Sequence, residues 1–368
     1  MIDELLRNLA IAPVMGQFHP LVPLCLPDGT DVRLNAREVA VEMDGRAASR
    51  VRPILIAELD HAYADRFITM NLIDLPDIER INAGLPNRLK AARALLTPRY
   101  IATRITADAL QHGYRVVALL LVDGLSYEDA RHWPEMPEPV FIDGPSITYF
   151  QAADGHILPD VGFAAIVGTP PLAQRLFQLG LKRARGYSYW DRESNDVAAM
   201  MFEGMPLRRV SGVNEGLNHL ANEPLEDLYI QIVRVGTDGL AHGRREVSSR
   251  EVAATVEAVR EDMLSLVHMI QKTELPGAVY VTSDHGMLWK RQHTLLEAND
   301  HRSPHPRYSA SPMAEDAPVS CFRAGDTAFS LYHYPFLGSP IRANNSGVHG
   351  GLSYWESIVP FVHIEVNL

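Results

Sequence analysis

One long amphipathic helix between two apolar segments constrains the fold of this chain more than any other feature. The helix is expected from Ser249 to Lys272, because apolar residues recur there at spacings of three and four and Ser248 to Glu251 form a capping box. The flanking segments, LYIQIVRV and AVYVTS, have the β-branched and aromatic composition of buried strands. A strand, a helix and a strand in this order form a right-handed βαβ unit, so both strands are predicted to lie in one parallel sheet.

Acidic residues and histidines follow the predicted strands at the points where the strands end. The carboxyl ends of strands in an open parallel sheet converge on one crevice, so we expect these side chains to meet. The ligand-rich positions are Asp123 after the apolar run VVALLLV, Asp238 with His242 after LYIQIVRV, Asp284 with His285 after AVYVTS, and the glycine-flanked His349.

Three carboxylates on one rim repel one another unless cations neutralise them, and this repulsion argues for metal ions. Oxygen and imidazole ligands without sulfur suit zinc, manganese or magnesium. Taken alone, each position also fits a structural role: Asp123 as a helix cap, Asp238 as half of a solvated pair, and His349 as part of a surface turn. Together, the positions favour a two-metal centre that clamps the oxygens of a phosphoryl transfer.

A hydroxyl nucleophile for this chemistry is expected between Asp123 and Asp238. The turn Gly144-Pro145-Ser146-Ile147-Thr148, after the extended segment PVFID, offers the hydroxyls of Ser146 and Thr148. An ordinary proline turn with a Ser/Thr cap explains the same residues, and spacing alone favours that structural role.

Composition narrows the functional classes. The 368 residues, 46% of them hydrophobic, suffice for one large domain with an appendage or for two domains. The net charge of −11 disfavours long nucleic acids as partners, although the basic run Lys182–Arg185 is a local exception. The two cysteines provide neither a disulfide framework nor a thiolate metal site. The sequence shows no signal peptide and no membrane-spanning apolar run, which predicts a cytoplasmic protein without membrane contact.

The order of the motifs resembles that of the alkaline phosphatase superfamily. An aspartate is followed by a Pro-Ser-x-Thr turn, by Asp-x-x-x-His, by a strand that ends Ser-Asp-His-Gly, and by a late His-Gly. The ending His-Gly-Gly-Leu-Ser from His349, with Asp123-Gly124-Leu125 and Glu356, is similar to the PglZ branch of that superfamily. The resemblance covers about Arg115 to the C-terminus and implies an α/β fold with an alkaline-phosphatase-like, largely parallel central sheet flanked by helices.

The resemblance implies a role for each matching position. By comparison with the nucleotide pyrophosphatase/phosphodiesterase branch, Thr148 is the nucleophile and Ser146 the second choice. Ionised on one ion, Thr148 would attack phosphorus in line, while the other ion takes the charge on the leaving oxygen and then activates water. Arg192 and Asn195 are weaker candidates for contact with phosphate. The implied ligands of the two divalent ions, with zinc first and manganese or magnesium as alternatives, are Asp238, His242 and His349 at site 1, and Asp123, Asp284 and His285 at site 2.

These features predict a metal-dependent phosphodiesterase of the PglZ type, which cleaves a small phosphodiester or a short oligonucleotide and is connected with phage defence and its protein partners. The alternatives are a phosphomonoesterase and a non-catalytic scaffold of a defence complex that retains structural metals. The catalytic domain is predicted over residues 113–368, with a lid loop at 299–318, after a smaller mixed α/β section of unknown role at 1–112.

Overall fold

This computed structural model describes residues 96–189, 200–220, 223–243, 246–298, 303–311 and 317–368, together with four short strands near the N-terminus. Arg192 and Asn195 lie outside the described residues, so their contact with phosphate stays a prediction. The four N-terminal strands pair in chain order as an antiparallel sheet and are β1 (Val22–Cys25), β2 (Asp31–Asn35), β3 (Ala40–Met43) and β4 (Arg46–Ala48).

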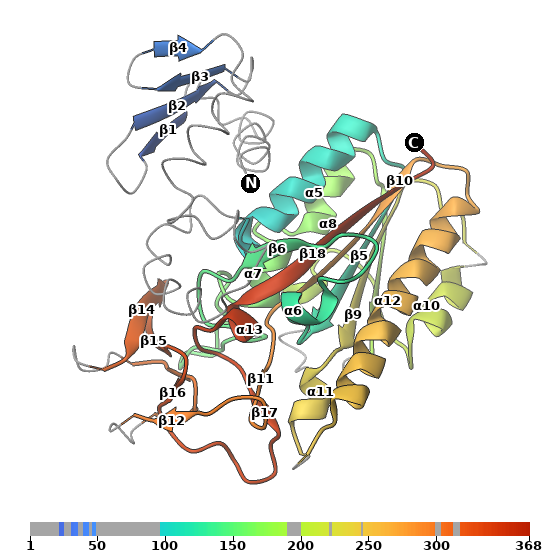
Figure 1. Cartoon of the computed structure of the whole chain (residues 1–368). Coiled ribbons are helices and arrows are strands. Elements are labelled where there is room, and N and C mark those ends of the chain that lie inside the picture. The colour runs from blue at the N-terminus through green and yellow to red at the C-terminus, as the bar shows by residue number, and fades with distance from the viewer. Residues whose placement is uncertain are drawn as a thin grey trace.

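A seven-stranded sheet in the order β6-β18-β10-β5-β9-β7-β8 forms the core of the remaining chain (Figure 1). Strands β10, β5, β9, β7 and β8 run parallel, which confirms the predicted largely parallel sheet. Strand β18 lies antiparallel between β10 and β6, a position that the sequence patterns did not indicate. The seven strands are β5 (Val116–Asp123), β6 (Glu138–Phe141), β7 (Arg183–Ser188), β8 (Leu207–Arg209), β9 (Leu228–Val235), β10 (Gly277–Ser283) and β18 (Ile358–Val366).

Helices cover both faces of this sheet (Figure 1). On one face lie α5 (Pro98–His112), α7 (Phe163–Val167) and α8 (Leu172–Gln178), and on the other lie α10 (Val213–Leu220) and α12 (Ser249–Gln271). Three short helices adjoin the central strands. Helix α6 (Tyr127–Ala130) follows β5, α11 (Asp238–Ala241) follows β9, and α13 (Tyr354–Ser357) precedes β18. None of the helices that the structure describes is long and apolar enough to cross a membrane.

Small sheets lie beyond one end of the central sheet (Figure 1). They are formed by β11 (Leu288–Trp289) with β17 (Gly347–Val348), by β12 (Leu296–Glu297) with β16 (Phe336–Leu337), and by β13 (Tyr308–Ser309), β15 (Thr327–Tyr332) and β14 (Val319–Ala324) in that order. The predicted lid loop at 299–318 therefore contains a short strand, and its role as a lid stays a prediction.

The central strand β5 is buried along its whole length, because helices pack on both of its faces. Val117, Leu119 and Leu121 point into the core beneath α5, whereas Ala118 and Leu120 point into the core beneath α12. This alternation follows from the two-residue repeat of a strand. A continuous apolar run is therefore what a strand covered on both faces requires.

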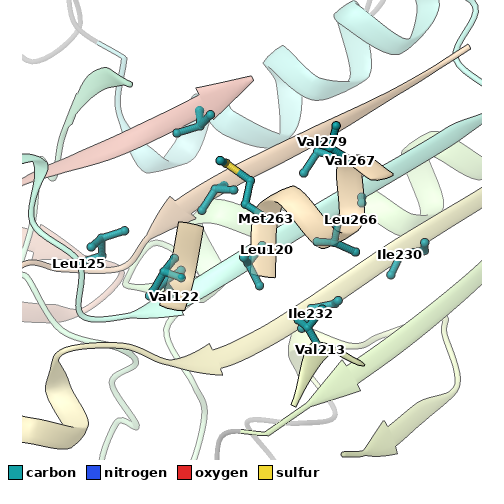
Figure 2. Packing of buried hydrophobic residues seen from close by; sticks show 14 of the residues in the cluster. Leu120, Val122, Leu125, Val213, Ile230, Ile232, Met263, Leu266, Val267 and Val279 are labelled. Carbon is teal, nitrogen blue, oxygen red and sulfur yellow. The ribbon is translucent and has the colours of Figure 1, made fainter. Parts of the chain in front are cut away.

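Helix α12 confirms the predicted amphipathic helix. The Ser248 hydroxyl accepts from the Glu251 amide, and the Glu251 side chain accepts from the Ser248 amide, as the capping box requires. Figure 2 shows Met263 and Leu266 of this helix in the same buried cluster as Leu120 of β5. The helix connects β9 to β10, and both strands pair in parallel with β5, so the predicted βαβ arrangement is confirmed.

Helix α5 packs into the same core, because Ile101 and Ile105 belong to the hydrophobic cluster that includes Val117 and Leu119. It ends at Gly113, whose φ of 65° suits a left-handed helix cap. The predicted domain boundary between 112 and 113 stays a prediction.

We expect Leu266→Ala to destabilise the protein by about 2–5 kcal/mol, because it truncates a fully buried side chain on the core-facing side of α12. The matched control is Leu110→Ala on α5, where the side chain is 50% exposed and the change should stay within about 0.5 kcal/mol. Urea unfolding of both variants measures the difference, and equal losses would contradict the described core.

Candidate metal centre

Three central strands deliver one carboxylate each to the same edge of the sheet. Asp123 is the last residue of β5, Asp238 begins α11 shortly after β9, and Asp284 directly follows β10. The three residues are 2%, 5% and 1% exposed, respectively. The expected convergence at the carboxyl ends of the strands is therefore present.

Two groups of acidic residues and histidines have ligand atoms within 4.8 Å of one another in the part of the chain that the structure describes. The first group is Asp123, Asp284 and His285, the set predicted for site 2. The second is Asp238, His349 and His285, which contains His285 where His242 was expected. His242 remains beside this group, with its Nε2 2.9 Å from Asp238 Oδ1. His285 thus joins the two groups, and the division into two ligand sets stays a prediction.

The three histidines present the same ring nitrogen to the carboxylates. Nδ1 of His285 lies 2.9 Å from the carbonyl oxygen of the next residue, and Nδ1 of His349 lies 2.9 Å from the carbonyl oxygen of Ser146. Nδ1 of His242 lies 3.0 Å from the side-chain amide of Asn345. A backbone carbonyl at Nδ1 fixes the hydrogen there and leaves Nε2 as the atom that binds a metal.

One oxygen of Asp284 lacks a hydrogen-bond partner among the described residues. Oδ1 accepts from the amides of Gly124 and His285, at 3.2 and 3.0 Å. The buried Oδ2 accepts no hydrogen bond from any described residue, although His285 Nε2 lies 3.6 Å away. A buried oxygen without a partner is costly, and a cation would satisfy it. The residues present therefore fit a divalent metal ion.

The titration behaviour of the cluster reflects its burial and its charges. Burial raises the pKa of Asp284 to about 7. Burial opposes a charge on His285, but the negative charges of Asp284 and Asp123 outweigh it and raise the His285 pKa to about 10. Burial also opposes ionisation of Asp238, but hydrogen bonds from His242 and His349 prevail and hold its pKa well below the usual range. Without metal, the proton on His285 balances part of the negative charge of Asp123 and Asp284.

We expect the metal-free protein to lose stability as the pH rises from about 4 to about 10, through Asp284 over the lower part of this range and through His285 over the upper part. Asp284 and His285 both have folded-state pKa values above their unfolded ones, so the folded state binds more protons and deprotonation weakens it. Urea unfolding in the presence of a chelator, at several pH values, measures the slope. Asp284→Asn should flatten that slope, and a stability that rises with pH over this range would contradict the assignment.

The Thr148 hydroxyl lies at the junction of the two groups. Its Oγ1 donates to Asp123 Oδ1 at 3.2 Å and lies 3.3 Å from His285 Nε2. The turn that carries it is held by Gly162, where a Cβ would come within 1.9 Å of the Thr148 carbonyl oxygen. Thr148 is half-buried, so its hydroxyl is not sealed from solvent.

Ser146, the second choice for the nucleophile, has a different environment. Its side chain is fully buried, and its Oγ donates to the Gly351 carbonyl at 3.2 Å and lies 3.3 Å from the Ser357 hydroxyl. Of the two hydroxyls on this turn, only Thr148 bonds to the carboxylates. The catalytic role of Thr148 stays a prediction.

His305 lies beside the cluster and was missed in the sequence. Its ring centroid is 6.0 Å from that of His349, and its Nδ1 accepts from the Arg307 amide at 3.3 Å. Burial, followed by the positive charges of the nearby histidines, lowers its pKa to about 3, so the ring is neutral. A histidine between two prolines in an aperiodic loop was the available signal, but such a loop does not indicate where it folds.

The fold and the site together define an α/β protein whose carboxylates and histidines gather at the carboxyl ends of parallel strands, a donor set that suits divalent metal ions. Neither a protein-family model nor a curated protein sequence matches the chain.

Several solved structures are similar to this chain. Murine ectonucleotide pyrophosphatase/phosphodiesterase 5 is 13% identical with a TM-score of 0.42, over 67% of this chain and 87% of its own. The soluble domain of lipooligosaccharide phosphoethanolamine transferase A from Neisseria meningitidis is 10% identical with a TM-score of 0.35, over 69% and 77%. A mutant of TAB5 alkaline phosphatase is 9% identical with a TM-score of 0.29, over 68% and 91%. Because these TM-scores are below 0.5, the function proposed below rests on the residues of this chain.

Proposed function

We propose that the chain is a metal-dependent phosphodiesterase of the PglZ type, in which Thr148 is the nucleophile. The observation that supports this most directly is the position of its hydroxyl. Oγ1 lies within 3.3 Å of both Asp123 Oδ1 and His285 Nε2, and His285 belongs to both groups of candidate ligands. A nucleophile between two ligand groups suits a two-metal phosphoryl transfer, in which the ions hold the attacking and leaving oxygens.

The candidate ligands fit two divalent ions, with zinc as the first choice and manganese or magnesium as alternatives. When bound, the ions would favour ionisation of the Thr148 hydroxyl and stabilise negative charge on the oxygens around phosphorus. The residues that would hold them are Asp123, Asp284 and His285 for one ion, and Asp238, His242 and His349 for the other.

The side chains of the site orient the reacting hydroxyl. Because Asp123 Oδ1 accepts the Thr148 hydrogen at 3.2 Å, the hydroxyl keeps an oxygen lone pair for attack on phosphorus. The attack forms a bond between the Thr148 oxygen and phosphorus and breaks the bond to the leaving oxygen, which departs as an alcohol. Water then cleaves the bond between phosphorus and the Thr148 oxygen, which releases a phosphomonoester and restores the hydroxyl. The carbonyls bonded to Nδ1 of His285 and His349 keep both Nε2 atoms directed at the carboxylates.

The substrate class follows from charge. At a net charge of −11, the chain suits a small phosphodiester or a short oligonucleotide better than long nucleic acid. The ordered motifs around His349 and Glu356, which are similar to those of PglZ proteins, support a connection with phage defence and with protein partners in that setting.

Thr148→Ala should abolish the release of nitrophenol from bis-p-nitrophenyl phosphate while leaving metal binding measurable. Thr148→Ser is the matched variant, because it keeps the hydroxyl, and it should retain part of the activity. Ser146→Ala should also retain activity, since its hydroxyl bonds to Gly351 and Ser357 instead of the carboxylates. Initial rates with added zinc or manganese, together with metal analysis of each protein, provide the measurement.

Two other outcomes would replace the proposed function. A wild-type protein that binds two metal equivalents but cleaves neither this diester nor p-nitrophenyl phosphate would support a scaffold with structural metals. Faster cleavage of the monoester than of the diester would indicate a phosphomonoesterase.

A further inference from the structure

A fully buried ion pair lies beneath the loop that carries His349. Arg307 and Glu356 are both 0% exposed. The guanidinium Nε and Nη2 donate to the two carboxylate oxygens at 2.9 and 2.8 Å, respectively, which makes the pair bidentate. Such a pair fixes direction as well as distance, because both groups are planar.

Glu356 connects this ion pair to both groups of candidate ligands. Its Oε1 accepts from the Gly351 amide at 3.1 Å, two residues after His349. Its backbone carbonyl accepts from the Gly286 amide at 2.9 Å, next to His285. One residue therefore holds the backbone beside two candidate metal ligands that come from distant parts of the chain.

Arg307 connects the same ion pair to the segment 303–311. Its Nη1 donates to the carbonyl oxygens of Phe336 and His333. A Cβ on Gly351 would come within 2.8 Å of its guanidinium carbon, so the loop after His349 packs directly on the arginine. The described part of the predicted lid is thus anchored to the loop of His349.

Stability alone does not account for this pair. Burying two charges costs free energy that their attraction roughly returns, and well-packed apolar residues in their place are often as stable or more stable. A buried pair with fixed directions does provide geometry that apolar packing lacks. Groups that orient metal ligands must likewise be held in fixed directions. The loss of such a group typically lowers metal affinity by about 10- to 100-fold.

We propose that Arg307 and Glu356 are positioning residues of the candidate metal centre, which hold the backbone of His349 and His285 in register. This inference rests on the proposed function, because it requires that the centre bind metal. It assigns a physical role to Glu356, which follows the His-Gly-Gly-Leu-Ser motif of residues 349–353 and whose role spacing alone does not explain.

The test compares Glu356→Gln and Arg307→Lys with Arg104→Lys in the full chain. Glutamine keeps an acceptor oxygen but removes the negative charge, and lysine keeps the positive charge but cannot make the bidentate contact of the planar guanidinium. Arg104 is the matched control, because it forms a buried ion pair with Asp108 within α5. Asp108 accepts a hydrogen bond from Tyr280 in the middle of β10 and not from a residue beside the candidate ligands. Zinc affinity is measured by competition with a chelator, apo-protein stability by thermal unfolding, and coordination by the visible spectrum of the cobalt-substituted protein.

We expect Glu356→Gln and Arg307→Lys to weaken the binding of at least one zinc equivalent by about 10-fold or more and to alter the cobalt spectrum. Arg104→Lys should lower the unfolding temperature without either effect. Wild-type zinc affinities in both site variants, or an equal loss of affinity in the Arg104 control, would overturn the inference. If one site variant does not fold, the other decides. A wild-type protein that binds no metal would instead refute the metal centre itself.

Discussion

The mutual repulsion of three buried carboxylates is the constraint on which the rest of this site depends. Asp123, Asp238 and Asp284 are all at most 5% exposed, and a buried charge without compensation is strongly destabilising. Imidazoles compensate them: His285 Nε2 lies 3.2 Å from Asp123 and 3.6 Å from Asp284, and His242 bonds to Asp238. Protons and metal ions would compete for the same Nε2 atoms, so folding stability, pH and metal binding are linked.

The close approach of the strand ends explains the glycines beside the acidic residues. Gly124 has a φ of 81°, and a Cβ there would lie 2.8 Å from the Asp238 amide nitrogen. A Cβ on Gly286 would lie 1.9 Å from the Trp355 carbonyl oxygen. The glycines that follow Asp123 and His285 are therefore needed because another segment of backbone occupies the space of a side chain.

Sequence patterns predicted the helices and strands in which the burial of each residue follows from its spacing to nearby residues in the chain. The spacing of Val252, Val256 and Val259 indicated the buried face of α12, and the apolar run before Asp123 indicated a strand covered on both faces. The convergence of the three aspartates followed from the topology of a parallel sheet.

Long-range pairings were not predictable in this way. Strand β18 lies antiparallel beside β10, and no periodicity specifies an insertion between two strands formed far earlier in the chain. The pair of Arg307 with Glu356 joins residues 49 positions apart, and the backbone amide of Arg307 donates a hydrogen bond to the His305 ring. These pairings depend on tertiary packing. The sequence therefore predicted the candidate metal ligands but not the residues, such as Arg307 and Glu356, that position them.

In the proposed division of the ligands, the two sets differ in their donor chemistry, because different strands supply their residues. Asp238 is surrounded by imidazoles, with His242 and His349 at 2.9 and 3.4 Å from its Oδ1. Asp123 and Asp284 share a single imidazole, and one Asp284 oxygen accepts no hydrogen bond from the described residues. Imidazole-rich sets suit zinc, whereas carboxylate-rich sets also suit manganese and magnesium. Under this division, an ion beside Thr148 would be selected less strictly, whereas zinc would be the favoured ion on Asp238.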